Sequence, residues 1–574
     1  MKKSRINVFA SLTLAAALLA SCAGLNKMKS GAVDVAYTVT PEVLEAHADK
    51  VDVTIKVKVP EKFMDKKSVI EATPVLKYEG GETAFPVYKF QGESVEGNDQ
   101  VISYANGGQL TYTGSVPYNE NMKVSDLVIR IKATKGDQTV DFDDYKIADG
   151  VVSTSGLVKD QGAMATIGKD NFKRIVSDEK GADIFFLIQQ ATLRGTELRK
   201  EEIKALKDYI VDAQADEKKQ FKGVDISAYA SPDGATDLNT RLAENREKVA
   251  QKYLAKELKK AKVDGSAEGF FTLKNTPEDW EGFKALMEAS TVQDKELILR
   301  VLSMYSDPEV RETEIKNMSE TYKVIADEIL PQLRRSKLAV NVDLIGKTDE
   351  EISALAVSAP DSLNIEEILY AATLAEGLDA KLAIYKAAAA NTPSCWRAQN
   401  DIAYILVQQD KLDEAKVALE KAAELKSTEP VVQNNLGVIA LRNGDLVKAE
   451  EYFGAAAGVG EELDNNLGIL SIHKGDYDAA MRYFGNSTTC NAGLAKILAG
   501  KYDAALSTLN ANTKEVGFKY YLKSIVGART ADNDLMFDSL RKAIELDGSL
   551  KEVVAKDMEF GKFLEDATFK SIIQ

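Results

Sequence analysis

The stretch Asn434-Asn435-Leu436-Gly437-Val438 decides the fold class of the C-terminal part of the chain, because it returns 31 residues later as Asn465-Asn466-Leu467-Gly468-Ile469. Small and aromatic residues follow each copy at equal spacings: Gly444, Ala449 and Phe453 after the first, and Gly475, Ala480 and Phe484 after the second. Such a period is the signature of stacked helix pairs, in which small residues let two helices approach and aromatic residues fill the space between them. The sequence therefore predicts an all-α solenoid over residues 364–574.

The spacing of these positions resembles the tetratricopeptide repeat, of which about five to six copies fit the solenoid. The resemblance implies that extended peptides or partner helices bind along a concave face. The residues that we expect on this face are Asn400, Tyr404, Asn434, Val438, Arg442, Asn465, Ile469 and His473. The face is mixed polar and apolar and lacks the lysine clusters that clamp peptide carboxylates. A protein partner is expected, without any indication of its identity.

Residues 178–345 alternate between strand-like and helix-like patterns, with a mostly helical insert at residues 263–330. Apolar runs or strict alternation predict strands, and apolar residues at steps of three and four predict helices. The strands are expected at 182–187, 224–230 and 338–344, and the helices at 196–211 and 237–260. The order β-α-β-α-insert-β predicts an α/β domain with a mixed sheet.

The second of these helices carries an arginine on its apolar side. Arg246 lies four residues after Leu242 and three before Val249, so it shares their face of the helix. An unpaired buried charge is costly, and the planar guanidinium suits a carboxylate. We therefore expect Arg246 to face the sheet and to bind an anion near the turn that precedes the helix.

The stretch from Tyr229 to Arg246 is similar to the outer-membrane protein A-like domain, which associates with peptidoglycan. Gly234, Asn239 and Arg246 match at the family spacing, and the resemblance covers about residues 182–344. It implies that Arg246 binds the carboxylate of the diamino acid in the wall peptide, with Asn239 in the same motif. Ser231 stands where the family has an aspartate, and Asp233 could substitute for that carboxylate. Three readings stay open: peptidoglycan contact, a protein partner at the same cleft, or a structural ion pair at Arg246.

Residues 35–160 have the pattern of β structure. Residues 51–59 alternate apolar and polar side chains at every step, which is typical of a half-buried strand. Asn106-Gly107-Gly108 lies between two further strand-like runs and indicates a hairpin. We expect a small antiparallel β-sandwich that serves as a spacer or docking module.

The N-terminus has the features of an export signal with a lipidation site. Lys2, Lys3 and Arg5 precede an apolar run that is too short to span a bilayer. Leu19-Ala20-Ser21-Cys22 resembles the bacterial lipobox, which implies removal of residues 1–21 and acylation of Cys22. Residues 22–34 are expected to be a linker. In some lipoproteins an aspartate after the acylated cysteine retains the protein in the inner membrane, and in some lineages an acidic run there directs it to the cell surface. Ala23 and the residues after it have neither feature, so we expect an outer-membrane lipoprotein that faces the periplasm.

The composition argues against several kinds of chemistry. A formal net charge of -16 disfavours nucleic acid as a partner, because phosphate binding needs a basic face. The chain has 2 histidines, in regions that look structurally unrelated, so histidine-based metal sites and nucleophile systems are not expected. Cys395 and Cys490 lie about three repeats apart, and we expect both to be free, buried thiols.

The predicted organisation is therefore multidomain, with no enzyme, metal or cofactor. A β-sandwich, an outer-membrane protein A-like α/β domain and, after a linker at residues 346–363, a repeat solenoid follow the lipid anchor in this order. The leading hypothesis is a lipoprotein that links the outer membrane to peptidoglycan and scaffolds a protein complex through its repeats. The alternative is an assembly or secretion accessory lipoprotein that binds only proteins.

Overall fold

The computed structural model describes residues 24–574, apart from the side chains of residues 319–320. The predicted signal peptide and Cys22 lie outside the described residues. The chain divides into two compact units, one that joins the residues up to Lys169 with Glu376–Gln574, and one formed by Asp170–Ala375. Among the described residues, no helix combines the length and apolar character needed to cross a membrane.

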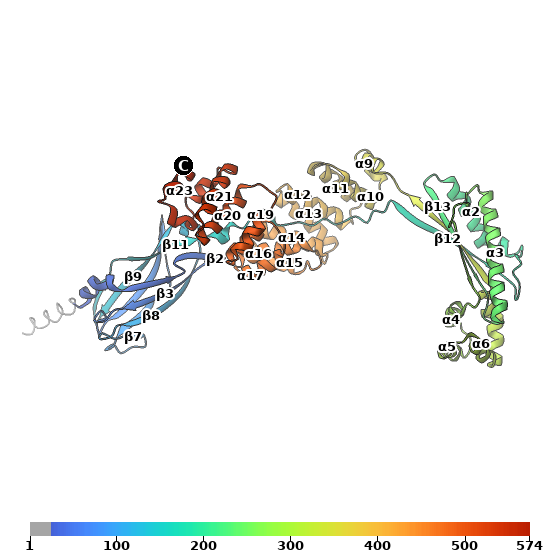
Figure 1. Cartoon of the computed structure of the whole chain (residues 1–574), viewed down its shortest axis with the longest axis horizontal. Helices are drawn as coiled ribbons and strands as arrows, with labels where there is room; N and C mark the ends of the chain where they lie inside the picture. Colours follow the sequence, from blue (N-terminus) through green and yellow to red (C-terminus); the bar gives the residue numbers. More distant parts are fainter. Residues whose placement is uncertain (1–23) are drawn as a thin grey trace, which may run out of the picture. The chain divides into compact units, whose positions relative to one another are not determined.

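The first unit begins with a β domain of eleven strands (Figure 1). Strand β3 shows why the sequence folds this way, because the alternate residues Val51, Val53 and Ile55 are buried and their neighbours face outward. The strands are β1 (Ala36–Thr40), β2 (Val43–His47), β3 (Lys50–Val59), β4 (Val69–Tyr78), β5 (Gly81–Ala84), β6 (Tyr88–Gly92), β7 (Gln100–Ile102), β8 (Gly108–Pro117), β9 (Ser125–Lys135), β10 (Gln138–Asp141) and β11 (Tyr145–Val152).

The expected sandwich of two separate antiparallel sheets is replaced by one continuous sheet, with the main order β1-β3-β2-β11-β9-β4-β6-β7. Strand β2 causes the difference, since it pairs antiparallel with β3 on one side and parallel with β11 on the other. Both of its edges are thereby paired. The resulting half-barrel encloses one apolar core. Residues 24–34, which we expected to be a linker, belong to this domain, because Leu25 and Met28 are buried in its core.

The second part of the first unit is the predicted all-α solenoid. Its helices are α11 (Leu378–Asn391), α12 (Trp396–Gln408), α13 (Leu412–Leu425), α14 (Pro430–Arg442), α15 (Leu446–Gly454), α16 (Glu461–His473), α17 (Tyr477–Phe484), α18 (Cys490–Leu498), α19 (Tyr502–Ala511), α20 (Gly517–Thr530), α21 (Asn533–Leu546), α22 (Leu550–Val554) and α23 (Ala567–Ile573), with a 3₁₀ helix at Met558–Phe563.

The repeated glycines of the solenoid lie where two helices of one repeat touch. A Cβ atom on Gly437 would lie 2.4 Å from the ring of Phe453, and one on Gly468 would lie 2.8 Å from the ring of Phe484. These distances are below van der Waals contact, so the small residue and the aromatic residue of each repeat require one another. The pairing that the sequence spacing predicted is thus a direct packing contact.

The second unit contains the predicted α/β domain. Its four-stranded sheet has the order β12-β15-β13-β14, antiparallel except for the parallel pair β13 and β14. The elements are β12 (Ile175–Phe185), α2 (Glu201–Ala215), β13 (Lys219–Tyr229), α3 (Thr236–Lys260), β14 (Phe271–Thr276), α4 (Trp280–Ala289), α5 (Lys295–Met304), α6 (Pro308–Lys316), α7 (Ser319–Val324), α8 (Leu330–Leu333), β15 (Arg335–Ile345), α9 (Asp349–Ser358) and α10 (Ile365–Leu374).

Two expectations about this unit need correction. The insert at residues 263–330 is not helical at its start, because β14 extends the sheet there; four of its six residues are exposed, which weakened the strand signal. The predicted linker at residues 346–363 contains α9, and α10 packs against α9 within the second unit rather than opening the solenoid. A capping box between Thr348 and Glu351 begins α9.

Candidate peptide groove and domain junction

The segment that follows the β domain lies along the repeats of the first unit. After short 3₁₀ turns at Thr154–Leu157 and Asp160–Gly162, the chain has no regular structure up to Lys169. We call residues 159–169 the strap. Its hydrogen-bond partners come from α12, α14, α16 and α18, the first helices of four successive repeats, and Figure 1 shows the segment passing along these helices.

Three asparagines each hold one strap residue by both of its backbone polar groups. The Asn435 side chain accepts from the N–H of Thr166 at 2.6 Å and donates to its carbonyl at 2.7 Å. Asn466 contacts the N–H and carbonyl of Met164 in the same way, at 2.7 and 2.9 Å. Asn491 contacts both groups of Lys159 at 2.9 Å. Along the chain, the strap runs toward earlier repeats.

A second row of side chains completes this ladder. Asn400, Asn434 and Asn465 donate to the carbonyls of Thr166, Met164 and Gly162, at 3.1, 3.0 and 2.9 Å. The carboxylate of Asp401 accepts from the N–H of Gly168 at 2.6 Å. We call these seven side chains the asparagine ladder: Asn400, Asp401, Asn434, Asn435, Asn465, Asn466 and Asn491.

The ladder is buried and is connected between repeats. Asn400, Asn434, Asn435 and Asn466 are fully buried. The Asn435 amide donates to Asn400, and the Asn466 amide donates to Asn434, both at 2.9 Å. Buried amides are favourable only when their groups are paired, so the strap backbone supplies partners that the fold needs. Because the ladder bonds mostly to main-chain groups, its contacts with the strap depend little on the side chains of the strap.

The residues expected on the concave face fall into three positions. Asn400, Asn434 and Asn465 contact the strap as described, and Val438 and Ile469 are fully buried. Tyr404 and Arg442 line a hollow beside the strap. His473 contacts the carboxylate of Asp160 at 2.7 Å.

Sequence reasoning missed the second member of each asparagine pair and the occupant of the groove. The repeat signature accounts for Asn435 and Asn466 without any bound segment, and no sequence pattern singles out Asp401 or Asn491. The doubled Asn434-Asn435 and Asn465-Asn466 were the available signal, because two adjacent amides at one helix position exceed what core packing requires. Nothing in residues 159–169 indicated that they would occupy the groove.

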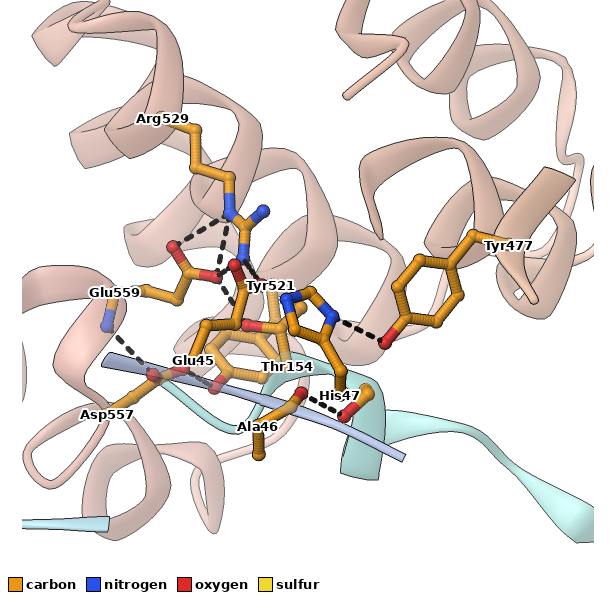
Figure 2. Close-up of polar contacts among 10 residues, drawn as sticks. Glu45, Ala46, His47, Thr154, Tyr477, Tyr521, Arg529, Asp557 and Glu559 are labelled. Atoms are coloured by element: carbon orange, nitrogen blue, oxygen red, sulfur yellow. Dashed lines mark hydrogen bonds and ion pairs between the residues drawn. The ribbon is translucent and has the colours of Figure 1, made fainter. Parts of the chain in front are cut away.

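A buried ion cluster joins the β domain to the C-terminal repeats (Figure 2). Arg529 of α20 contacts Glu559 at 2.5 Å and Glu45 of β2 at 2.6 Å. Thr154 also donates to Glu559. The side chains of Arg529 and Glu559 are 15% and 5% exposed, so these charges lie largely out of water.

The charges in this cluster change one another's proton affinity. Although burial disfavours the cation, Glu559 and Glu45 raise the pKa of Arg529. Burial raises the pKa of Glu559, and the nearby Arg529 opposes this effect. Burial likewise raises the pKa of Asp557, which accepts a hydrogen bond from Tyr521. Among the residues of this cluster, the three carboxyl groups of Glu45, Asp557 and Glu559 thus outnumber the single guanidinium of Arg529.

Two further contacts fix the same edge of the β domain. The hydroxyl of Ser155 donates to the carbonyl of Ala46 at 2.9 Å. His47 lies 3.3 Å from the hydroxyl of Tyr477 on α17, and Figure 2 shows the two rings on opposite sides of this contact. Together with the strap, these contacts attach the β domain to the repeats at several points.

The second unit places Arg246 as expected but gives it different partners. Arg246 is 1% exposed and faces the sheet from α3. It forms no ion pair with any described residue. It donates instead to the carbonyls of Gln190, Tyr229 and Leu187 at 3.0, 2.8 and 3.3 Å, and its guanidinium lies over the ring of Phe186. Three carbonyl dipoles therefore satisfy its donors among the described residues, and binding of an external anion stays a prediction.

The remaining residues of the predicted wall-binding motif bond to one another and to Arg334. Ser231 donates to Asp233 at 2.5 Å, and Arg334 contacts Ser231 at 3.1 Å and Asp233 at 2.8 Å. Asn239 donates to the carbonyl of Gly234 at 2.9 Å and closes the turn. Burial, followed by repulsion from Arg334, lowers the pKa of Arg246 to about 10. Asp233 thus forms an ion pair with Arg334, whereas Arg246 has no ion pair among the described residues.

Residues 24–574 contain no cluster of three or more side chains suited to a metal ion. Cys395 and Cys490 are free, as predicted. Cys395 is buried, whereas Cys490 is partly exposed, and burial raises the pKa of its thiol.

Comparison with known proteins identifies the repeats. The tetratricopeptide repeat family matches residues 397–429, which span α12 and α13. A comparison with curated proteins finds no match. The chain is similar to the solved structure of YrrB, a TPR protein with an unusual peptide-binding site, with 20% identity over 29% of this chain and 92% of that one and a TM-score of 0.24.

Two other solved structures are similar to the same degree. A tetratricopeptide repeat protein from Parabacteroides merdae ATCC 43184 shares 14% identity over 43% of this chain and 99% of its own, with a TM-score of 0.29. PilF of Pseudomonas aeruginosa shares 15% over 38% of this chain and 98% of its own, with a TM-score of 0.29. The family match, together with the helix pairs described above, shows that the C-terminal region is a tetratricopeptide repeat array, a fold that scaffolds protein–protein interactions and is generally non-catalytic.

Proposed function

We propose that this chain is a non-enzymatic scaffold lipoprotein of the outer membrane whose repeat array binds extended polypeptide by its backbone. The observation that carries the proposal is the asparagine ladder, which bonds backbone groups of Lys159, Gly162, Met164, Thr166 and Gly168. Its ligand in this structure belongs to the same chain. The array thereby attaches the β domain to the repeats and presents both domains as one scaffold to partner proteins.

The groove can be tested by proteolysis, because Lys159 and Lys169 are trypsin sites within the strap. In the wild-type protein the ladder should protect these bonds. The double variant Asn435→Ala/Asn466→Ala removes four hydrogen bonds to the strap. Since each bond contributes about 0.5–1.5 kcal/mol, trypsin should cleave this variant after Lys159 and Lys169 at least about tenfold faster than the wild-type protein. Asn391→Ala/Asn443→Ala, at two exposed positions, is the matched control. Equal cleavage of both variants contradicts the proposal.

The lipid anchor is the second element of the proposal. An acylated Cys22 would lie three residues before Leu25, which is buried in the β-domain core. Since an extended chain spans at most about 3.6 Å per residue, the acyl group would hold the β domain within about 11 Å of the point of attachment. Metabolic labelling with a fatty acid should mark the wild-type protein and not Cys22→Ala. Protease treatment of intact cells should leave the protein uncut if it faces the periplasm.

Peptidoglycan contact is a second candidate function, through the outer-membrane protein A-like domain that we propose for the second unit. Asp233 pairs with Arg334, so the charge of Arg246 has no counter-ion among the described residues, and this excess positive charge suits the carboxylate of a wall peptide. The hydrogen bonds that Arg246 already donates to backbone carbonyls argue against wall contact. The geometry therefore favours the function in which the chain binds only proteins. Sedimentation with purified peptidoglycan separates the two. Retention that Arg334→Gln abolishes, with unchanged circular dichroism, supports wall contact, and no retention of the wild-type protein rejects it.

A further inference from the structure

One edge of the strap backbone is free. In an extended chain the N–H and C=O groups of successive residues point to opposite sides. Met164, Thr166 and Gly168 turn theirs toward the ladder. Among residues 24–574, no hydrogen bond engages the N–H or C=O of Ala165 or Ile167. The strap therefore presents an unpaired strand edge on the side away from the ladder, which is the feature that recruits a further strand.

The groove has room beside this edge. A hollow of about 620 Å³ is bordered on the strap by Gln161, Ala163, Met164 and Ala165, and on the repeats by Tyr404, Val407, Gln408, Asp410, Arg442 and Glu462. Its volume is within the range of about 300–1,000 Å³ that is usual for ligand sites. Ala163 and Ala165 have small side chains, so an incoming backbone can approach the strap closely.

A second hollow lies beside Met164 and continues the first. It measures about 500 Å³, and the repeat residues around it include Glu461, Asp464, Asn465 and Arg482. The two hollows share Met164, which is 40% exposed. An extended ligand along the strap would therefore contact both.

The charge of the two hollows is negative. In the first, Arg442 is already engaged by Asp410 and by the carbonyl of Val407, which leaves Glu462 without an ion pair among the described residues. In the second, Glu461 and Asp464 outnumber Arg482. A ligand with lysine or arginine side chains would offset this excess, whereas an acidic ligand would increase it.

We propose that the strap is a template on which an extended, basic segment of a partner protein adds as a β-strand. The segment would pair with Ala165 and Ile167 and direct its cationic side chains toward Glu462, Glu461 and Asp464. This mode is β-augmentation, in which main-chain bonds provide affinity and flanking side chains provide selectivity. This proposal rests on the proposed function of the groove, because the partner segment can add only while the asparagine ladder holds the strap in place.

The test uses the full mature chain and a fluorescent peptide of about six alternating lysine and valine residues with blocked ends. Anisotropy should show binding. A copy of the peptide methylated on alternate backbone nitrogens should bind at least about tenfold more weakly, because it loses its main-chain donors. A copy with glutamate in place of lysine should also bind more weakly. Equal binding of the methylated copy, or no binding of the lysine peptide, overturns the proposal.

Protein variants locate the site. Ala165→Pro removes the N–H on the free edge without removing a ladder bond, and should weaken binding about tenfold. Glu462→Gln should weaken binding, and Glu424→Gln, at an exposed position on α13, is the matched control. If neither Ala165→Pro nor Glu462→Gln has an effect, the peptide binds elsewhere and the proposal is wrong.

Hydrogen exchange separates addition from displacement. With the lysine peptide bound, the amides of Met164 and Thr166 should remain protected, and those of Ala165 and Ile167 should gain protection. Loss of protection at Met164 and Thr166 would mean that the peptide replaces the strap, which contradicts addition. In the free protein, protection of Met164 and Thr166 reports on the proposed groove function itself, so failure of that function is seen before any peptide is added.

Discussion

Replacement of Arg529 by methionine should destabilise the first unit strongly. Met removes the guanidinium that contacts Glu559 at 2.5 Å and Glu45 at 2.6 Å, and it keeps a similar apolar volume. The Glu559 side chain is 5% exposed, so its carboxylate would remain buried without a counter-ion. Breaking a buried ion pair by removing one partner costs about 3–5 kcal/mol. We therefore expect the free energy of unfolding to fall by about 3–5 kcal/mol at neutral pH.

The assay is denaturant unfolding at two pH values. Burial already raises the pKa of Glu559 above its usual value, and loss of Arg529 removes the group that opposes this rise. The folded variant would then bind the proton of Glu559 more tightly than the unfolded variant does. Its stability should rise as the pH falls through the range above the usual glutamate pKa, so the difference from the wild-type protein should shrink there.

Two further variants keep this reasoning testable. Arg529→Met/Glu559→Gln removes both charges, and it should recover at least half of the loss, since replacement of both partners is far less costly than removal of one. Arg541→Met removes an exposed arginine of α21 and should change the stability by no more than about 0.5 kcal/mol. The reasoning is refuted if Arg529→Met costs no more than Arg541→Met, or if the double variant is as unstable as the single one.

Three other predictions follow from single contacts. Gly437→Ala places a Cβ 2.4 Å from the Phe453 ring and should cost about 1–3 kcal/mol in thermal or denaturant unfolding, whereas Gly454→Ala, whose Cβ meets nothing within 4 Å, should not. Because burial raises the pKa of Asp557, the wild-type protein should gain stability relative to Asp557→Asn as the pH falls from neutral toward the usual aspartate range, and a constant difference across pH would contradict this. Thiol titration of an unfolded variant that lacks residues 1–22 should find both Cys395 and Cys490, and a missing thiol would contradict the free state. In the folded protein, the partly exposed Cys490 should react first.

The repeat array and the α/β domain were predictable because their signals are local. Gly437 and Phe453 lie on the two helices of one repeat, and Gly468 and Phe484 make the same contact in the next repeat. Arg246 could be placed facing the sheet because the helical period alone determines which side chains share its face. By contrast, β14 was missed because most of its residues are exposed and it joins the sheet by pairing with β13.

By itself, the sequence determined that the N-terminal domain is β, that an α/β domain follows and that the C-terminal region is a helical repeat array, and it determined the inward direction of Arg246. Only the tertiary structure decided what the residues of these domains contact. The Asn435–Thr166 pair joins residues 269 positions apart, and Arg529 and Glu45 are 484 positions apart. No periodicity connects such positions, because their meeting depends on how whole domains pack. The same reason applies to Arg246, because only the fold brings the carbonyls of Gln190, Tyr229 and Leu187 within hydrogen-bond distance of its guanidinium.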